Sequence, residues 1–423
     1  MKTNRTRALT AALSLALLAG TGLISAPGAA AAPAATSSYI VQTRSSAATT
    51  QQVGELRHAG SRVGARYSRV LNGFVGELSA RQVRALRADP SVASVTRDVR
   101  LSISDSRVTR GSQANALAQP AGTWGLDRID QRGVTRDGLF HYDSTGKGVT
   151  AFVIDSGIRI SHSQFGGRAS HGYDFVDDDT NASDCPNGTG HGTHVAGTLG
   201  GSTYGVAKEV KLVSLRVFDC EGNATLSDFI SSLEWAVAHK PAGPALINFS
   251  GGGPEDEVTE AAVSRTIRAG ISVVVAAGND DINACDDSPA GVAAALTVAA
   301  SDANDREAGF SSHGSCVDLF APGVSVWSAG IASNTATMNM SGTSMAAPHV
   351  AGAVAQYLQQ EPKASPSQVS ATLVQRATRN RLTLADASPN RLLYTGNTYA
   401  PGNVRVVRRG AQPVVPGAVG DQS

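Results

Sequence analysis

The chain has 423 residues, of which 41% are hydrophobic and 17% charged, so it can hold more than one domain around a large core. The net charge of +1 combines two unequal parts: residues 1–117 carry 15 basic and 5 acidic residues, and the remainder carries 21 and 30. The basic residues of the first part are dispersed arginines without interleaved aromatics. This pattern argues against nucleic-acid binding and favours a basic segment that docks on its own acidic neighbour.

The first 32 residues have the pattern of a secretory signal peptide. Lys2, Arg5 and Arg7 precede an apolar run at 8–24, and the small residues at 29–32 offer cleavage sites. The alternative is a membrane anchor, which needs roughly 20 uninterrupted apolar residues. The apolar run is shorter and is interrupted at 20–22, so we expect export and an extracellular protein.

The next segment predicts a small two-layer domain with the order β-α-β-β-α-β. We expect strands at 39–42, 66–70, 73–78 and 92–99, helices at 49–59 and 79–87, and a hairpin at Asn72-Gly73. Residues 105–121 are polar and without pattern, as in a linker.

From Trp124 onward, apolar runs alternate with helical stretches. This alternation predicts an α/β domain with a parallel sheet covered on both faces. In such sheets functional residues gather at the carboxyl ends of the strands, where Asp155, Ser250 and Asn279 are expected. The tail 399–423 is rich in Pro, Gly and Val, with a basic patch at 405–409, which is typical of a flexible or removable segment.

Three short motifs carry chemistry. The run GTSMAAPHVAG at 342–352 places Ser344 at a Gly-rich turn that opens a helix. A serine needs a base and an orienting acid to become a nucleophile. Asp155 ends an apolar run, and His191 begins the motif HGTHVAG. Each residue alone would be a turn or capping residue, but together they predict a catalytic Asp-His-Ser set.

Two further polar residues bear on this prediction. Asn279 follows a strand in the sequence AAGN and can donate its amide to an oxyanion. His191 and His194 have spacing that also occurs in zinc sites, but the Glu of a zincin motif is absent after His191. We therefore expect His194 to be a core residue.

The three motifs, in this order, resemble those of subtilisin-type serine proteases of the proteinase K and aqualysin branch, over residues 124–394. The resemblance implies a three-layer subtilisin-like fold with a mainly parallel central sheet, preceded by a small ferredoxin-like α+β propeptide domain. It also implies a self-processing endopeptidase in which Asp155 orients His191, His191 is the base, Ser344 attacks, and Asn279 stabilises the oxyanion. The expected boundaries are 1–32 signal peptide, 33–117 inhibitory propeptide and linker, 118–398 catalytic domain, and 399–423 tail.

Four cysteines in an exported chain favour two disulfides, and no Cys-x-x-Cys pair indicates a metal site. The sequence itself leaves three pairings open. The resemblance to aqualysin-like enzymes selects Cys185–Cys220 and Cys285–Cys316.

Substrate is expected to bind as an added β-strand. By resemblance the edges are Gly222-Asn223-Ala224 and Ser250-Gly251-Gly252, Leu226 lines a distal pocket, and Ala276-Ala277-Gly278 border the primary pocket. These small residues, without a charge, predict a broad preference for apolar or aromatic residues before the scissile bond. Gly251 departs from the leucine usual in relatives and removes an apolar wall.

Structural calcium is the cofactor that the resemblance implies, since calcium prefers several oxygen ligands. One site maps onto Asp318 and the carbonyls of Ala293 and Ala295. A second maps onto Asp127, Asp130, Gln131 and Asp137, for which ordinary surface acids are the alternative. The acidic run at 177–179 is more simply a solvated loop. The expected partners are protein substrates and the chain's own propeptide.

Two other function classes, an esterase and an inactive scaffold, fit the sequence less well. An α/β-hydrolase esterase needs Gly-x-Ser-x-Gly and the order Ser, Asp, His. Here Ala346 replaces the last glycine and the order differs. An inactive scaffold would not need all four chemical positions filled. A monomeric protease is therefore the sequence-based prediction.

Overall fold

The computed structural model describes residues 35–103 and 123–396, together with the backbone of 405–407. The predicted signal peptide, the whole linker 105–121 and most of the tail lie outside these residues. Within the tail, β21 (Arg405–Val407) pairs antiparallel with β6 (Phe140–Tyr142). No helix in the described residues is long and apolar enough to cross a membrane.

The N-terminal domain has the predicted β-α-β-β-α-β order. Its elements are β1 (Thr36–Thr43), α1 (Ser46–His58), β2 (Val63–Tyr67), β3 (Gly73–Ser79), α2 (Ala80–Ala88) and β4 (Val92–Arg97). The strands form an antiparallel sheet in the order β2-β3-β1-β4. Both helices contribute to one small core with the sheet, since Val53, Leu86 and Phe74 belong to the same buried cluster.

The strand predicted at 66–70 is wrong in its position, because β2 ends at Tyr67. Beyond this point the backbone N–H groups of Ser68, Arg69 and Val70 donate to the carboxylate of Glu234. These donors are therefore turned toward a distant helix instead of a neighbouring strand.

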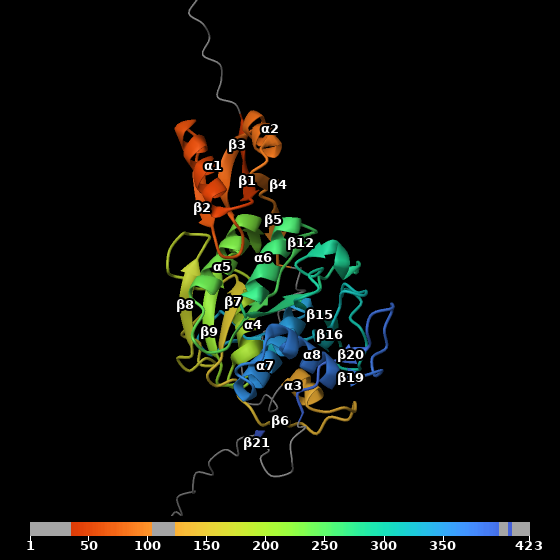
Figure 1. Cartoon of the computed structure of the whole chain (residues 1–423). Coiled ribbons are helices and arrows are strands. Elements are labelled where there is room, and N and C mark those ends of the chain that lie inside the picture. Colours follow the sequence, from red (N-terminus) through yellow and green to blue (C-terminus); the bar gives the residue numbers. More distant parts are fainter. Residues whose placement is uncertain (1–34, 104–122, 397–404, 408–423) are drawn as a thin grey trace, which may run out of the picture. The chain divides into compact units, whose positions relative to one another are not determined.

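The larger domain is built on a nine-stranded sheet in the order β19-β20-β16-β15-β13-β11-β7-β9-β8 (Figure 1). All pairs are parallel except β19–β20. The strands are β7 (Thr150–Asp155), β8 (Ala169–Asp174), β9 (Lys211–Arg216), β11 (Ala245–Phe249), β13 (Ser272–Ala276), β15 (Leu296–Ser301), β16 (Leu319–Pro322), β19 (Thr378–Arg379) and β20 (Arg391–Leu392).

Helices cover both faces of this sheet, so the predicted three layers are present. Successive side chains of one strand enter different cores: Val153 packs with α4 (His191–Gly200) and α7 (Thr343–Gln360), and Phe152 packs with α5 (Leu226–Ala238) and α6 (Glu257–Arg268). The strands are buried on both faces, which explains their continuous apolar runs. The remaining elements are α3 (Trp124–Ile129), α8 (Pro366–Arg376), η1 (Ala284–Asp286) and the short strands β5 (Arg100–Ser102), β10 (Asn223–Thr225), β12 (Gly253–Pro254), β14 (Asp287–Ser288), β17 (Val326–Ala329) and β18 (Thr337–Met340).

Candidate active site

Asp155 and His191 meet at the carboxyl end of β7 and the start of α4. Oδ1 of Asp155 lies 2.7 Å from Nδ1 of His191, and both side chains are fully buried. A carboxylate in this place accepts the Nδ1 proton and leaves Nε2 with a free lone pair. Within the described residues Nε2 of His191 has no hydrogen-bond partner, so it is available to accept a proton.

Ser344 is the second residue of α7 and is also fully buried. Its hydroxyl donates to the carbonyl of Ser250 at 3.2 Å, while the hydroxyl of Ser250 donates to the carbonyl of Ser344 at 3.1 Å. The hydroxyl is therefore directed toward the end of β11 rather than hydrogen-bonded to His191. A side-chain rotation of Ser344 is needed before the two groups can exchange a proton, as is common without substrate.

Asn279 lies just beyond the end of β13, as predicted. Its Oδ1 accepts hydrogen bonds from the N–H and the hydroxyl of Thr343, at 2.8 and 2.9 Å. These bonds fix the orientation of the amide, so that Nδ2 is its free donor. Nδ2 is buried and has no partner among the described residues. The N–H of Ser344, in the first turn of α7, likewise has no intrahelical acceptor. Two donors thus flank the serine.

His194 is a core residue, as expected, and not a partner of His191 in a zinc site. It is fully buried and its Nε2 lies 2.9 Å from the carbonyl of Val326. Burial lowers the pKa of His194 to about 3, which keeps the imidazole neutral.

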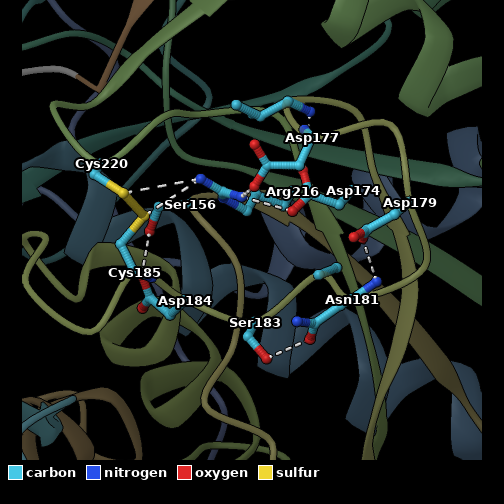
Figure 2. A network of polar contacts seen from close by, with 12 residues as sticks. Ser156, Asp174, Asp177, Asp179, Asn181, Ser183, Asp184, Cys185, Arg216 and Cys220 are labelled. Carbon is cyan, nitrogen blue, oxygen red and sulfur yellow. Dashed lines mark hydrogen bonds and ion pairs between the residues drawn. A yellow bond between two sulfur atoms is a disulfide. The ribbon is translucent and has the colours of Figure 1, made fainter.

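Asp184 connects the two segments that present Asp155 and His191, through Ser156 on one side and Thr193 on the other. Figure 2 shows Asp184 beside Ser156. One carboxylate oxygen accepts from the hydroxyl of Ser156 at 3.0 Å, and the other accepts from the N–H and hydroxyl of Thr193 at 3.0 and 2.6 Å. Burial raises the pKa of Asp184 to about 6. The sequence analysis assigned Asp184 no role of its own, because an aspartate beside a cysteine in a loop has no distinguishing local pattern.

The segment from 100 to 103 lies between the two edges predicted to bind substrate. β5 pairs antiparallel with β10, and Ser102 exchanges two backbone hydrogen bonds of 3.1 Å with Gly252. The N–H of Ile103 donates to the carbonyl of Gly222 at 3.0 Å. Leu101 is buried in the same cluster as Leu226. The chain therefore occupies its own groove as an added strand, which is how an extended peptide is bound.

The comparisons with known proteins agree with this geometry. Residues 146–396 match the subtilase family, Peptidase S8, and residues 28–104 match the peptidase inhibitor I9 family. The chain belongs to the subtilase family. It is 48% identical to an extracellular serine proteinase of Thermus sp. (strain Rt41A), covering 79% of this chain and 78% of that protein.

Other relatives are similar in kind. An alkaline serine exoprotease A of Vibrio alginolyticus is 46% identical, over 77% of this chain and 59% of that protein. The crystal structure of a cold-adapted subtilisin-like serine proteinase has a TM-score of 0.63 and 45% identity, covering 65% of this chain and 98% of that one. This subtilase is accordingly a serine endopeptidase that carries an inhibitor domain.

Both disulfides of the subtilase have the pairing that the resemblance implied. Cys185 joins Cys220 and Cys285 joins Cys316. Figure 2 shows Arg216 beside the first disulfide, where it also pairs with Asp174 and Asp177 at 2.6 Å each. The acidic run at 177–179 is thus not merely solvated.

The inhibitor domain contacts the catalytic domain through a shared apolar cluster, to which Tyr67, Val70 and Leu71 belong, and through carboxylates and backbone donors. Glu234 of α5 accepts from three successive N–H groups of the loop after β2. Asp98 accepts from the N–H and hydroxyl of Ser227, at 3.0 and 2.8 Å, in the first turn of α5, where the helix dipole favours negative charge. In the described part of the chain, the one ion pair across this contact is Arg69–Glu234. The predicted docking is present, but paired charges do not dominate it.

A pocket of about 440 Å³ opens beside the end of this occupying strand. Seven residues predicted to bind substrate line it: Gly222, Asn223, Gly251, Gly252, Ala276, Ala277 and Gly278. Ser250, Ala224 and Leu226 are not part of its lining. Three acidic residues, Glu221, Asp280 and Asp287, are also part of its lining. The expectation of a pocket without charge is therefore wrong, because it considered only the residues of the AAGN segment.

The structure joins three of the second set of predicted calcium ligands by hydrogen bonds, whereas the fourth, Asp130, is bonded to His141. Asp127 accepts from the Gln131 amide at 2.8 Å and from the N–H groups of Asp137 and Gly138, and the same amide reaches Asp137 at 3.0 Å. Oδ1 of Asp130 is buried without a partner among the described residues. Burial raises the pKa of Asp130 to about 7.

The other candidate ligands are more dispersed. Asp318 accepts from the N–H of Thr297 at 3.0 Å, and burial raises its pKa. Ala295 is buried and Ala293 is exposed. A separate cluster that the sequence analysis did not include, Asp281, His313 and Asp386, has nitrogen–oxygen distances of 3.5 and 3.9 Å, which are those of ion pairs.

Proposed function

We propose that this protein is a secreted, self-processing serine endopeptidase in which Ser344 attacks the peptide carbonyl. The observation that carries the proposal is the buried Asp155–His191 pair with a free Nε2, together with the unpartnered amide donor of Asn279 next to the turn that carries Ser344. The extracellular relatives and the I9 inhibitor match support export and a zymogen form.

Each residue of the site has a distinct role in this mechanism. His191 Nε2 takes the proton of Ser344 as the hydroxyl attacks the carbonyl carbon, and later gives it to the leaving amine. Asp155 holds the imidazole in the tautomer with a proton on Nδ1 and stabilises the imidazolium. The amide of Asn279 and the N–H of Ser344 donate to the oxygen as it gains negative charge.

The same groove explains inhibition and processing. The strand 100–103 uses the backbone groups of Gly222 and Gly252 that a substrate would use, so substrates are excluded while it is bound. The described part of this segment ends at Ile103, which is bound in the groove and directly precedes the linker, and this supports self-cleavage in the linker 105–121. We propose that the cleaved N-terminal domain then remains as an intramolecular inhibitor until it is degraded.

The primary pocket accepts large side chains, since its walls include Ala276, Ala277 and Gly278. Apolar and aromatic residues before the scissile bond are therefore proposed as substrates.

Calcium is proposed as a structural ion. Asp127, Asp130, Gln131 and Asp137 carry the oxygen ligands that calcium prefers, and the unpartnered buried oxygen of Asp130 supports this site. The amide of Gln131, which now donates to Asp127 and Asp137, would have to turn its oxygen toward the ion. The carboxylate of Asp318 with the carbonyls of Ala293 and Ala295 is the second proposed site. A bound ion would neutralise buried negative charge and would have no part in the reaction.

Calcium removal should lower stability more than it changes the chemistry. We expect chelation to lower the Tm of the wild type by several degrees, because calcium at a concentration of about 100 times its Kd stabilises the folded protein by about 2.7 kcal/mol. In Asp130→Asn, chelation should change the Tm much less. Calorimetry with and without calcium measures both. An equal Tm in chelator and in calcium would contradict the calcium sites.

Replacing the nucleophile tests the function itself. Ser344→Ala should leave the exported chain at full length and without activity, while the wild type becomes shorter and active. Loss of the triad serine in subtilisin, a member of the same family, lowers kcat by about 10⁶, and we take that value as the expectation. Intact mass and hydrolysis of a peptide anilide measure the two results. A processed and active Ser344→Ala protein would overturn the proposal.

A further inference from the structure

The primary pocket has an acidic lining with no basic residue. Glu221, Asp280 and Asp287 are its charged residues. Asp287 is half-buried, whereas Asp280 and Glu221 are exposed. Within the described residues, no hydrogen bond or ion pair engages the side chain of any of the three. Partial burial of a carboxylate without a partner costs free energy, and a cationic substrate side chain bound in the pocket would supply that partner.

Asp287 is held in position by its backbone. It belongs to β14, whose antiparallel pairing with β12 places it opposite Pro254. Its carbonyl accepts from the N–H of Gly291 at 2.7 Å. A methyl group placed on Gly278 would lie 3.3 Å from Oδ2 of Asp287. The carboxylate therefore reaches the wall formed by the segment that leads to Asn279.

We propose that Asp287 makes this pocket selective for lysine and arginine before the scissile bond, over uncharged side chains of equal length. This inference rests on the proposed endopeptidase function and identifies the substrate class of the same site. The small walls of Ala276, Ala277 and Ala290 contact the apolar stem of such a side chain. The cationic end then meets the one half-buried carboxylate of the lining.

The chemistry of long basic side chains fits these surroundings. Lys and Arg place an apolar stem along apolar surface and keep the charge at its end. A cation that reaches Asp287 supplies the partner that the carboxylate lacks, and hydrogen bonds with charged partners are the stronger kind. Asp280 and Glu221 add a negative field at the pocket. The same field disfavours acidic residues before the scissile bond.

The test compares peptide anilides that differ only in this residue: lysine, norleucine, phenylalanine and glutamate. Norleucine is the control for lysine because it has the same length without the amine. We expect kcat/KM for lysine to exceed that for norleucine about tenfold, the typical effect of one charged hydrogen bond. Asp287→Asn should remove this advantage, so that kcat/KM for the lysine and norleucine peptides agree within about threefold.

Two matched variants distinguish a direct contact with Asp287 from the negative electrostatic potential of the whole pocket lining. Asp280→Asn and Glu221→Gln remove the same charge from exposed positions of the lining. Each should reduce the lysine advantage by less than about threefold, because exposed charges are screened. A larger loss in Asp280→Asn than in Asp287→Asn would overturn the assignment to Asp287.

The pH dependence gives a second readout. Burial raises the pKa of Asp287, and the nearby Asp280 and Asp286 raise it further. The other titratable groups facing this segment, Glu255 and Glu260, are also acidic. As the pH falls through this raised pKa the carboxyl becomes neutral, so the lysine-to-norleucine ratio should fall toward its value in Asp287→Asn. The ratio cancels the ionisation of His191, which acts on both substrates.

The outcomes are distinguishable. Hydrolysis of norleucine and phenylalanine peptides without a lysine advantage would overturn this inference and leave the endopeptidase function intact. Absence of hydrolysis for all peptides by the processed wild type would contradict the proposed function. Titration of the active serine with an irreversible inhibitor shows that Asp287→Asn is folded. A ratio that does not depend on pH in the wild type would also count against Asp287.

Discussion

The proposed catalytic centre and the primary pocket are neighbours, but they differ in how their polar side chains are hydrogen-bonded. In the catalytic centre Asp155 is bonded to His191, and Asn279 is bonded through Thr343. In the pocket, within the described residues, the carboxylate of Asp287 has no bonded partner. Catalytic side chains must be held in one orientation by hydrogen bonds, whereas a specificity-determining carboxylate can remain unbonded until a substrate side chain binds it.

This difference explains why the two regions respond differently to substitution. A residue of the catalytic centre acts on the carbonyl that every substrate has, so its loss should lower the rate for all peptides alike. A residue of the pocket contacts only the variable side chain. Its loss should change the order of preference among peptides and leave the rate for the best uncharged peptide almost unchanged.

Asn279→Ala is the variant that most directly tests the first half of this comparison. Removing one oxyanion donor lowers kcat in subtilisin by about 10²–10³, and we expect a loss of that size here for lysine and norleucine peptides alike. KM should change little, because Nδ2 acts on charge that appears in the transition state. Steady-state kinetics on both peptides measure kcat and KM separately.

Asn279→Asp is the matched control, since it preserves the size of the side chain but cannot supply the same neutral donor. It should be as slow as Asn279→Ala. A loss confined to one of the two peptides would show that Asn279 contributes to recognition, and the contrast between the two regions would fail.

The positions of the proposed catalytic residues could be predicted because each lies within a short motif whose local structure is set by neighbouring residues. Ser344 follows a glycine turn at the start of α7, and Asp155 ends a strand whose apolar run is continuous. The sheet places Asp155, Ser250 and Asn279 at or just beyond the carboxyl ends of β7, β11 and β13. Strand-to-helix alternation was sufficient to predict the three layers.

Features that depend on distant parts of the chain could not be predicted. β2 ended early because Glu234, more than 160 positions away, accepts three of the following N–H groups. The Arg128–Asp305 ion pair, buried at 2.7 Å, joins residues separated by 177 positions. Asp287 lies eight residues after Asn279 and enters the pocket through the pairing of β12 with β14. No local pattern indicates such contacts.

Substitution of Gly251, which lines the pocket, is expected to have the smallest effect of these variants. It tests which side chain fills the space beside this glycine. The sequence suggested that this glycine leaves an apolar wall missing. In the structure a methyl group on Gly251 would lie 2.5 Å from Cζ of Phe218. Phe218 is fully buried and stacks on Phe249, with ring centroids 5.8 Å apart. The aromatic ring therefore fills the space that a larger residue would need.

We expect Gly251→Ala to cost about 1–3 kcal/mol in the free energy of unfolding, because it crowds a packed ring. Phe218→Leu should cost a comparable amount through the space it leaves. The double variant should be more stable than the sum of the two losses by about 0.5–3 kcal/mol, as residues in contact are coupled. Denaturant unfolding of the inhibited Ser344→Ala protein measures this without self-digestion. Additive losses would show that Phe218 does not occupy the place of the missing wall, and would leave the groove beside Gly251 open to substrate side chains.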